Sequence, residues 1–342
     1  MTKTKKLLVA LAAVATMSLA ACSSSSDSAS TDTAATAEST QAVKKIAFFG
    51  FWKSNSFTQA VLAGVQEAAA AAGAEVVDLS TAQYDAAAQI KAVQDQTIKG
   101  DAQMYIMLAS DSVGMATAAQ EAIAKGITVV ASFTPLGAKF DTLEPQVPGL
   151  IVVGETPVSN GKVLAELAIS ACESKSPCNV AYLEGFKALP LDNARTKAFV
   201  DTLKASSTAA NKIKLVAQVE GGYAADSGKK AAQDVIQAHP EVNVMVGSSQ
   251  AILGATDVVD VKKVALIGNG SSTEAYANVK SGKWFGLYNS DIKGMGAKSV
   301  EIGLDAANGK NPNPVFDTQT LLDPHGTASV VGDLAGTYSD LS

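Results

Sequence analysis

Short apolar runs alternate with longer amphipathic stretches from residue 43 to residue 308. The runs are continuous rather than broken by polar positions, which is typical of parallel strands buried on both faces. The stretches between them have helical periodicity, and Ser56 is expected to cap the first helix, with Gly73 just past its end. The expected strands are residues 43–51, 75–79, 104–108, 128–133, 150–153, 179–183, 213–219, 242–246, 263–267 and 284–288. The expected helices are residues 56–72, 86–99, 112–125, 158–171, 193–206, 227–238, 251–258, 273–281 and 292–308.

This alternation predicts an α/β fold with parallel sheets. The chain has 342 residues, and an ordered part of about 275 residues favours two lobes over one. Ligands of such folds bind at the carboxyl ends of the strands. The residues there are mostly amides, hydroxyls and aromatics, which suit a neutral, polyhydroxylated or partly apolar small molecule. For each aromatic residue, simple core packing is the alternative. The candidates taken from these positions are Trp52, Lys53, Gln250, Asn269 and Asn289.

Composition excludes several classes of function. The net charge of −6 argues against nucleic acid as a partner, since a nucleic-acid binder needs a basic face. Only two histidines occur, His239 and His325, so neither a histidine-rich metal centre nor a histidine-based catalytic triad is expected. The segment at residues 222–230 has the wrong spacing for a phosphate loop, and residues 268–270 lack the third glycine of a dinucleotide fingerprint. We therefore expect no enzyme activity, no cofactor and no metal.

Arginine is nearly absent from the chain. Of 27 basic residues, only Arg195 is an arginine. A single arginine is consistent with a need for its planar, bidentate guanidinium, and equally with a structural salt bridge or chance.

Residues 1–21 have the pattern of a signal peptide. Three lysines precede a 15-residue apolar run that is too short to span a bilayer comfortably. The run ends in Leu-Ala-Ala before Cys22, which resembles a bacterial lipobox and implies cleavage there and lipid attachment to Cys22; an ordinary signal peptide is the alternative. Residues 22–43 are rich in Ser, Thr, Ala and Asp and are expected to form a disordered tether. The folded part is therefore expected outside the membrane, held by a lipid anchor.

Two further cysteines, Cys172 and Cys178, flank an expected turn. In an oxidising compartment they are expected to form a disulfide between a helix end and the next strand, with two free buried thiols as the alternative.

Several stretches combine into a known pattern. Residues 46–76 hold a strand, an Asn-x-Phe sequence and a helix that ends in glycine; residues 183–199 place Arg195 four residues before Phe199. Residues 90–100, 235–255 and 264–284 match at the corresponding spacing. Together these stretches make residues 44–315 resemble the type 1 periplasmic binding proteins of sugar ABC transporters, most closely the ribose-binding-like branch.

The resemblance implies two Rossmann-like lobes joined by a three-segment hinge, with ligand bound in the cleft between them. The expected crossings lie near residues 154–156, 288–291 and 318–321. The expected N-terminal lobe is residues 44–155 plus 290–318, and the C-terminal lobe is residues 156–289 plus 319–342.

The family's ligand positions are transferred one by one. The resemblance implies ligand contacts from Asn55, Phe57, Arg195, Tyr223 and Ser248, and from strand-end positions at Phe133, Thr134 and Ser290. The sequence departs from the ribose-like pattern at several of these positions.

The departures remove acidic groups that accept bonds from sugar hydroxyls. Phe133-Thr134 replaces Asp-Arg, Ser248-Ser249 replaces Asn-Asp, Gly270 replaces Asp and Ser290 replaces Gln. With Arg195 kept and Lys53 nearby, the cleft is expected to be more positive. This favours a sugar derivative with an anionic or acyl group, or a less polar ligand held between aromatics.

The sequence thus indicates a monomeric, lipid-anchored, extracytoplasmic solute receptor. It would capture a sugar or sugar derivative and deliver it to the permease of an ABC importer. The alternatives are a ligand sensor of the same fold and a receptor for a non-sugar small molecule.

Overall fold

The computed structural model describes residues 43–208 and 212–341. The expected signal peptide, Cys22 and the tether up to residue 42 lie outside the described residues. The described residues all belong to one compact unit, Thr40–Ser342. None of its described helices is long and apolar enough to span a membrane.

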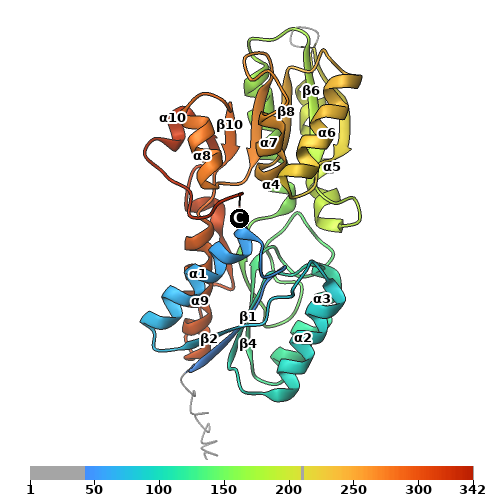
Figure 1. The fold of residues 1–342 in the computed structure, drawn as a ribbon. Helices are drawn as coiled ribbons and strands as arrows, with labels where there is room; N and C mark the ends of the chain where they lie inside the picture. The colour runs from blue at the N-terminus through green and yellow to red at the C-terminus, as the bar shows by residue number, and fades with distance from the viewer. Residues whose placement is uncertain (1–42, 209–211, 342) are drawn as a thin grey trace, which may run out of the picture. The chain divides into compact units, whose positions relative to one another are not determined.

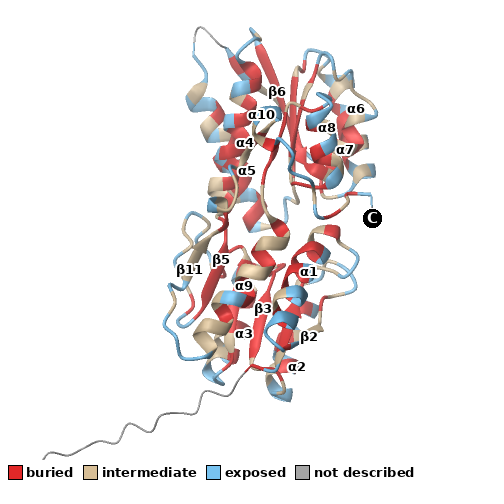
Figure 2. Cartoon of the chain, turned by 90° about the vertical axis from the view of Figure 1, so that its left-hand side faces the viewer, coloured by how far each residue is buried: buried red, intermediate tan, exposed pale blue. Residues whose placement is uncertain are grey.

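The first lobe is built on a six-stranded sheet, of which β1, β2 and β4 are labelled in Figure 1. Its strands all pair in parallel, in the order β11-β5-β4-β3-β1-β2. Four of these strands are almost wholly buried, as the continuous apolar runs predict (red in Figure 2). The strands are β1 (Lys45–Phe49), β2 (Glu75–Asp78), β3 (Met104–Met107), β4 (Thr128–Phe133), β5 (Ile151–Gly154) and β11 (Val315–Asp317).

Helices cover both faces of this sheet. One face packs against α1 (Ser56–Ala71) and α9 (Ile292–Ala307), around Phe48, Met104 and Ile106. The other packs against α2 (Ala86–Lys99) and α3 (Ser112–Ala124). The first lobe therefore has two apolar cores, one on each side of its sheet.

The second lobe has a sheet of the order β12-β10-β9-β8-β6-β7. Its strands are β6 (Cys178–Glu184), β7 (Ile213–Glu220), β8 (Val244–Ser248), β9 (Ala265–Asn269), β10 (Gly286–Tyr288) and β12 (His325–Thr327). All pairs are parallel except β10 with β12, which is antiparallel. The α/β prediction is confirmed, with this one antiparallel pair as the exception to parallel sheets.

The second sheet is also covered on both faces. On one face lie α4 (Pro157–Cys172) and α5 (Pro190–Ser206). The other face carries α6 (Ala225–Ala238), α7 (Ser249–Thr256), α8 (Thr273–Lys280) and the short α10 (Ala328–Val331).

The chain passes between the two sheets three times. It leaves the first sheet after β5, returns to it after β10 with α9, and leaves it again after β11 through the 3₁₀ turn η1 (Thr318–Thr320). The lobe boundaries expected from the sequence stay a prediction.

The start of α1 differs from the expectation. Asn55, not Ser56, caps this helix: its backbone is extended, and its Oδ1 atom accepts from the Thr58 N–H at 2.9 Å. An asparagine side chain satisfies a free helix N–H as well as a serine does, so sequence alone does not separate the two positions.

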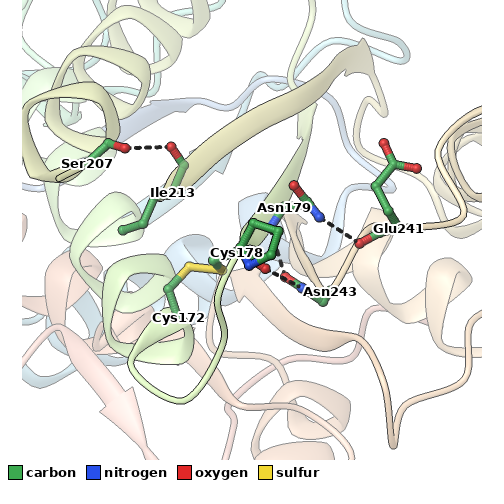
Figure 3. The surroundings of a disulfide bond; sticks show 8 residues. Cys172, Cys178, Asn179, Ser207, Ile213, Glu241 and Asn243 are labelled. Atoms are coloured by element: carbon green, nitrogen blue, oxygen red, sulfur yellow. Dashed lines mark hydrogen bonds between the residues drawn. A yellow bond between two sulfur atoms is a disulfide. The ribbon is translucent and has the colours of Figure 1, made fainter. Parts of the chain in front are cut away.

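A disulfide joins Cys172, at the last turn of α4, to Cys178, at the start of β6, with Cα atoms 5.5 Å apart (Figure 3). The strand start beside it is also fixed by an asparagine pair: the Asn179 N–H donates to Asn243 Oδ1 at 2.9 Å, and Asn243 Nδ2 donates to the Pro177 carbonyl at 3.1 Å.

Helices α1 and α9 approach each other through two glycines. A Cβ atom at Gly64 would lie 2.0 Å from the Lys293 carbonyl oxygen, and one at Gly296 would lie 2.2 Å from the Val61 carbonyl oxygen. Any side chain at these positions would force the backbones apart.

We therefore predict that Gly64→Ala lowers the free energy of unfolding by about 1–3 kcal/mol, measured by urea denaturation, because overpacking displaces α9. Ala63→Ser, on the exposed face of the same helix, is the control and should change stability by less than about 0.5 kcal/mol. Equal stability of the two variants would contradict the close contact.

Candidate functional site

A cavity of about 110 Å³ lies between the carboxyl ends of the strands of the two sheets. Both lobes and two of the crossings contribute to its wall. The aromatic lining residues are Phe51, Trp52, Phe57, Tyr84, Phe133, Tyr223, Tyr288 and Tyr338. The polar ones are Asn55, Glu155, Asn160, Asp192, Arg195, Ser249, Gln250, Asn269 and Ser290, and Leu189, Leu191, Gly270 and Ile292 complete the lining.

The first lobe supplies an aromatic cluster. The Phe57 ring lies edge-on to Phe133, with centroids 4.9 Å apart, and Phe51 contacts both rings at 6.3 and 6.1 Å. Phe133 ends β4 with a φ of 78°, a backbone conformation that non-glycine residues rarely adopt. Such strain persists where the surroundings enforce it, and here it accompanies a ring that lines the cavity.

Tyr84 connects this cluster to the second lobe. Its ring lies 6.0 Å from Phe51 and 6.2 Å from Phe186, and Phe186 is edge-on to Tyr223 at 5.2 Å. The Tyr84 hydroxyl donates to the Ser110 carbonyl at 2.7 Å, which fixes the ring. Aromatic contacts therefore extend from one lobe to the other along the cavity.

The second lobe supplies a buried ion pair at the start of α5. Asp192 Oδ1 accepts from Arg195 Nη1 at 2.7 Å and from the Tyr223 hydroxyl at 2.6 Å, while Oδ2 accepts from the Phe186 N–H at 2.8 Å. Asp192 lies in the first turn of its helix, where the helix dipole favours a carboxylate. Burial, and then the Asp192 charge, raise the pKa of Tyr223 well above its usual value, so Tyr223 stays a neutral donor.

The expectation of a more positive cleft is wrong. The Arg195 charge is neutralised by Asp192, three residues earlier on the same helix. Lys53 does not line the cavity; its side chain is 59% exposed and lies 3.9 Å from Asp78. Although the acids at the strand ends are missing, Asp192 on helix α5 supplies the negative charge that neutralises Arg195.

Part of the Arg195 guanidinium is left for a ligand. Its two hydrogen bonds, to Asp192 and Tyr223, both use Nη1. Within residues 43–208 and 212–341, no hydrogen bond involves its Nη2, and its Nε is buried without a partner. A planar fork with two open donors can bind an oxygen-bearing ligand through paired hydrogen bonds.

A second polar network connects all three crossings. The Tyr288 hydroxyl, at the end of β10, donates to Glu155 Oε2 after β5 and accepts from Gln319 Nε2 in η1 at 2.8 Å. Glu155 Oε1 accepts from Asn160 Nδ2 at 2.9 Å, and Asn160 exchanges hydrogen bonds with Asn269 at 3.1 and 3.2 Å. Burial raises the pKa of Glu155 from 4.5 to about 7, despite these donors and the Arg195 charge.

Nine of the thirteen ligand positions expected from the sequence line the cavity, and four do not. Lys53 is exposed and lies outside the lining. Thr134 is buried away from the cavity, Ser248 caps α7 and donates to the Gly222 carbonyl at 2.7 Å, and Asn289 binds the Tyr276 hydroxyl and the Asp323 carbonyl. The nine lining residues are Trp52, Asn55, Phe57, Phe133, Arg195, Tyr223, Gln250, Asn269 and Ser290.

Sequence reasoning missed the acids of the cavity and its C-terminal tyrosine. Asp192 carries a usable signal, because a carboxylate three residues before the chain's single arginine lies on the same helical face. Glu155 and Tyr338 carry none, since each enters the site through the tertiary arrangement. No cluster of three metal-binding side chains occurs in the described ranges.

The buried pair can be tested by removing its negative charge. Asp192→Asn leaves the Arg195 charge buried without a counter-ion, so we expect the free energy of unfolding to fall by about 3 kcal/mol or more in urea. Asp201→Asn breaks the exposed pair with Lys197 on the same helix and should cost less than about 1 kcal/mol. If both variants lose a similar free energy of unfolding, the buried Arg195 does not depend on Asp192 as its counter-ion.

The pKa of Glu155 predicts a pH dependence of stability. Because the folded protein holds a proton on Glu155 up to about pH 7, while an unfolded chain releases it near 4.5, the Glu155 contribution to stability falls as pH rises through this window. Glu155→Gln cannot ionise at this position, so the free energy of unfolding of the wild type should fall relative to that of the variant as pH rises from about 4.5 to about 7. Urea titrations at several pH values measure it.

The control is Glu67→Gln, at an exposed carboxylate that pairs with Lys293. The free energy of unfolding of this variant should change with pH in the same way as that of the wild type over the same range. If the free energies of unfolding of the wild type and of Glu155→Gln also change with pH in the same way, the raised pKa of Glu155 is contradicted.

Comparison with known proteins agrees with this architecture. A search of curated proteins found no significant match. Solved structures of the same fold include an ABC transporter solute-binding protein from Actinobacillus succinogenes 130z with bound D-allose (18% identity, TM-score 0.70, 80% of this chain and 95% of that one). Another is a carbohydrate transporter solute-binding protein from Agrobacterium radiobacter with D-arabinose (21%, 0.70, 85% and 96%). A third is a solute-binding protein from Agrobacterium vitis with α-D-tagatopyranose (16%, 0.71, 85% and 97%).

The family model described as "Periplasmic binding protein domain" matches residues 46–311, more than half of the chain, and the chain therefore belongs to the periplasmic binding protein family.

Proposed function

We propose that this protein is an extracytoplasmic receptor that captures a small sugar or sugar derivative between its lobes and delivers it to an ABC importer. The observation that carries the proposal is the interlobe cavity, which combines aromatic rings from both lobes with the open donors of Arg195. Family membership supports the same role, and the solved structures with D-allose and D-arabinose show that sugars occupy this fold elsewhere.

The chemistry of the cavity suits a sugar ring. Aromatic faces such as Phe57 and Trp52 pack against the C–H faces of a pyranose, while Gln250, Asn269 and Ser290 offer donors and acceptors to its edge. The Arg195 fork would bind a ring or carbonyl oxygen, or an acyl or anionic substituent. An acidic pair for vicinal hydroxyls is missing, because both lining carboxylates already accept bonds from protein groups.

This last observation favours one second candidate, a receptor for a less polar molecule. Glu155 already accepts two hydrogen bonds from protein groups and Asp192 accepts three, so fewer of their lone pairs are left for ligand hydroxyls. A ligand with fewer hydroxyls loses less when it leaves water for such a cavity. A lactone or a substituted aromatic ring would satisfy the aromatic walls and the Arg195 donors.

Transport through this fold would rest on binding rather than on catalysis. Ligand contacts made by both lobes stabilise a closed form, and the importer can distinguish loaded from empty receptor by that form. A lipid on Cys22 and the tether that follows would hold a monomeric receptor at the cell membrane. A sensor that presents the ligand to a membrane receptor instead would use the same cavity.

A thermal-shift screen of sugars, sugar acids, lactones and aromatic compounds tests the ligand class. A compound at 100 times its Kd should stabilise the protein by about 2.7 kcal/mol, a shift of several degrees in Tm. Arg195→Lys, which keeps the charge but loses the fork, should weaken binding of the best compound by about tenfold or more in isothermal titration.

Lys53→Ala is the matched control, because Lys53 is the nearby cation that lies outside the cavity. Its affinity should equal that of the wild type. A large loss with Lys53→Ala and none with Arg195→Lys would refute the proposed site.

A further inference from the structure

The segment after α10 returns to the start of α8 and ends beside the cavity (dark red in Figure 1). It contributes no strand to either sheet, and no sequence pattern links it to a ligand site. Residue 338 nevertheless lines the cavity, so this C-terminal segment, residues 332–341, needs an explanation of its own.

Several hydrogen bonds join the segment to the start of α8 in the second lobe. The Tyr338 carbonyl accepts from the Thr273 N–H at 2.8 Å and from its hydroxyl at 3.1 Å. Glu274 accepts from the Ser339 hydroxyl at 2.7 Å and from the Asp340 N–H at 2.8 Å. Gly336 lies so close to α8 that a Cβ there would be 2.2 Å from the Thr273 nitrogen. These contacts fix the position of the segment against α8.

Tyr338 reaches from this anchor to the first lobe. Its side chain is 8% exposed, its hydroxyl accepts from the Ser271 N–H at 3.1 Å, and its ring lies edge-on to Phe57 of α1 at 6.4 Å. It also packs with the core on the α1 side of the first sheet. Because its hydroxyl is engaged by the protein, Tyr338 presents mainly an apolar surface to the cavity.

We propose that the C-terminal segment is a part of the ligand site and that Tyr338 is its specificity-determining residue. The ring forms a wall of the cavity that Arg195 also lines, limits ligand size, and packs against an apolar or C–H face of the bound molecule. This inference rests on the proposed function, since it names a further wall of the same binding site.

The wall has a consequence for how ligand enters. Tyr338 is carried by the second lobe and Phe57 by the first, so any motion that separates the lobes also parts these two rings. A ligand that contacts both rings would therefore favour the form in which they meet. Ligand affinity should depend on Tyr338 even though no sheet or major helix contains it.

A first experiment needs no ligand. Ser290→Cys in the full chain places a thiol on the cavity wall, and its rate of reaction with iodoacetamide reports access to the cavity. We expect that adding Tyr338→Ala raises this rate at least fivefold, because a wall is removed. Leu334→Ala, in the same segment but outside the lining, should leave the rate unchanged. A rate that Tyr338→Ala does not alter would overturn the proposal.

A second experiment measures affinity with D-allose, D-arabinose and the less polar δ-valerolactone by isothermal titration of the full chain. For any probe that binds, Tyr338→Ala and a chain ending at residue 333 should bind at least tenfold more weakly. Tyr338→Phe, which keeps the ring, should lose less affinity than Tyr338→Ala, and Leu334→Ala should lose none. Equal affinity of wild type and Tyr338→Ala would overturn the role of the ring.

The two experiments separate the two proposals. If Tyr338→Ala opens the cavity to iodoacetamide but none of the three probes binds the wild type, the wall is supported and the ligand class of the proposed function is contradicted. Circular dichroism and Tm of each variant establish that the compared proteins are folded.

Discussion

One hydroxyl group joins the three places where the chain passes between its lobes. Tyr288 donates to Glu155 and accepts from Gln319, and each of the three residues belongs to a different crossing. Each strand end that lines the cavity is positioned relative to the opposite lobe through these crossings. Since the network is buried, an unmet polar group there costs far more than the same group in water. The lobes can therefore change their separation only in ways that keep these bonds paired or replace them.

The cost of leaving a buried polar group unpaired also explains why most polar side chains of the cavity are bonded to other protein groups. Asp192, Arg195 and Tyr223 hydrogen-bond to one another, and so do Glu155, Asn160 and Asn269. A site built this way is prepared before the ligand arrives, because its polar groups need no rearrangement. What remains for a ligand is the aromatic surface and the few donors that the networks leave open, so shape and apolar contact must provide much of its selectivity.

The sequence predicted the fold well because the physical signal was local. Apolar runs marked ten of the strands, whereas β11 (VFD) and β12 (HGT) hold too few consecutive apolar residues to give such a run. Strand-end reasoning found Trp52, Gln250 and Asn269 without any coordinates. It failed for the charge of the cleft, since Asp192 comes from a helix rather than from a strand end. It could not find Tyr338, whose place depends on the return path of the last residues.

The two lobes are interleaved along the chain, and this bears on when they can fold. The first lobe takes α9 and β11 from sequence that follows β10, and the second takes β12 from sequence later still. During synthesis, α1 leaves the ribosome long before the helix that its glycine contacts. The apolar core between the first sheet, α1 and α9 cannot close until α9 has been made, whereas the core on the α2 and α3 side of that sheet uses only residues 47–152. A growing chain that has passed α1 but not yet α9 therefore exposes the apolar residues of this core to solvent.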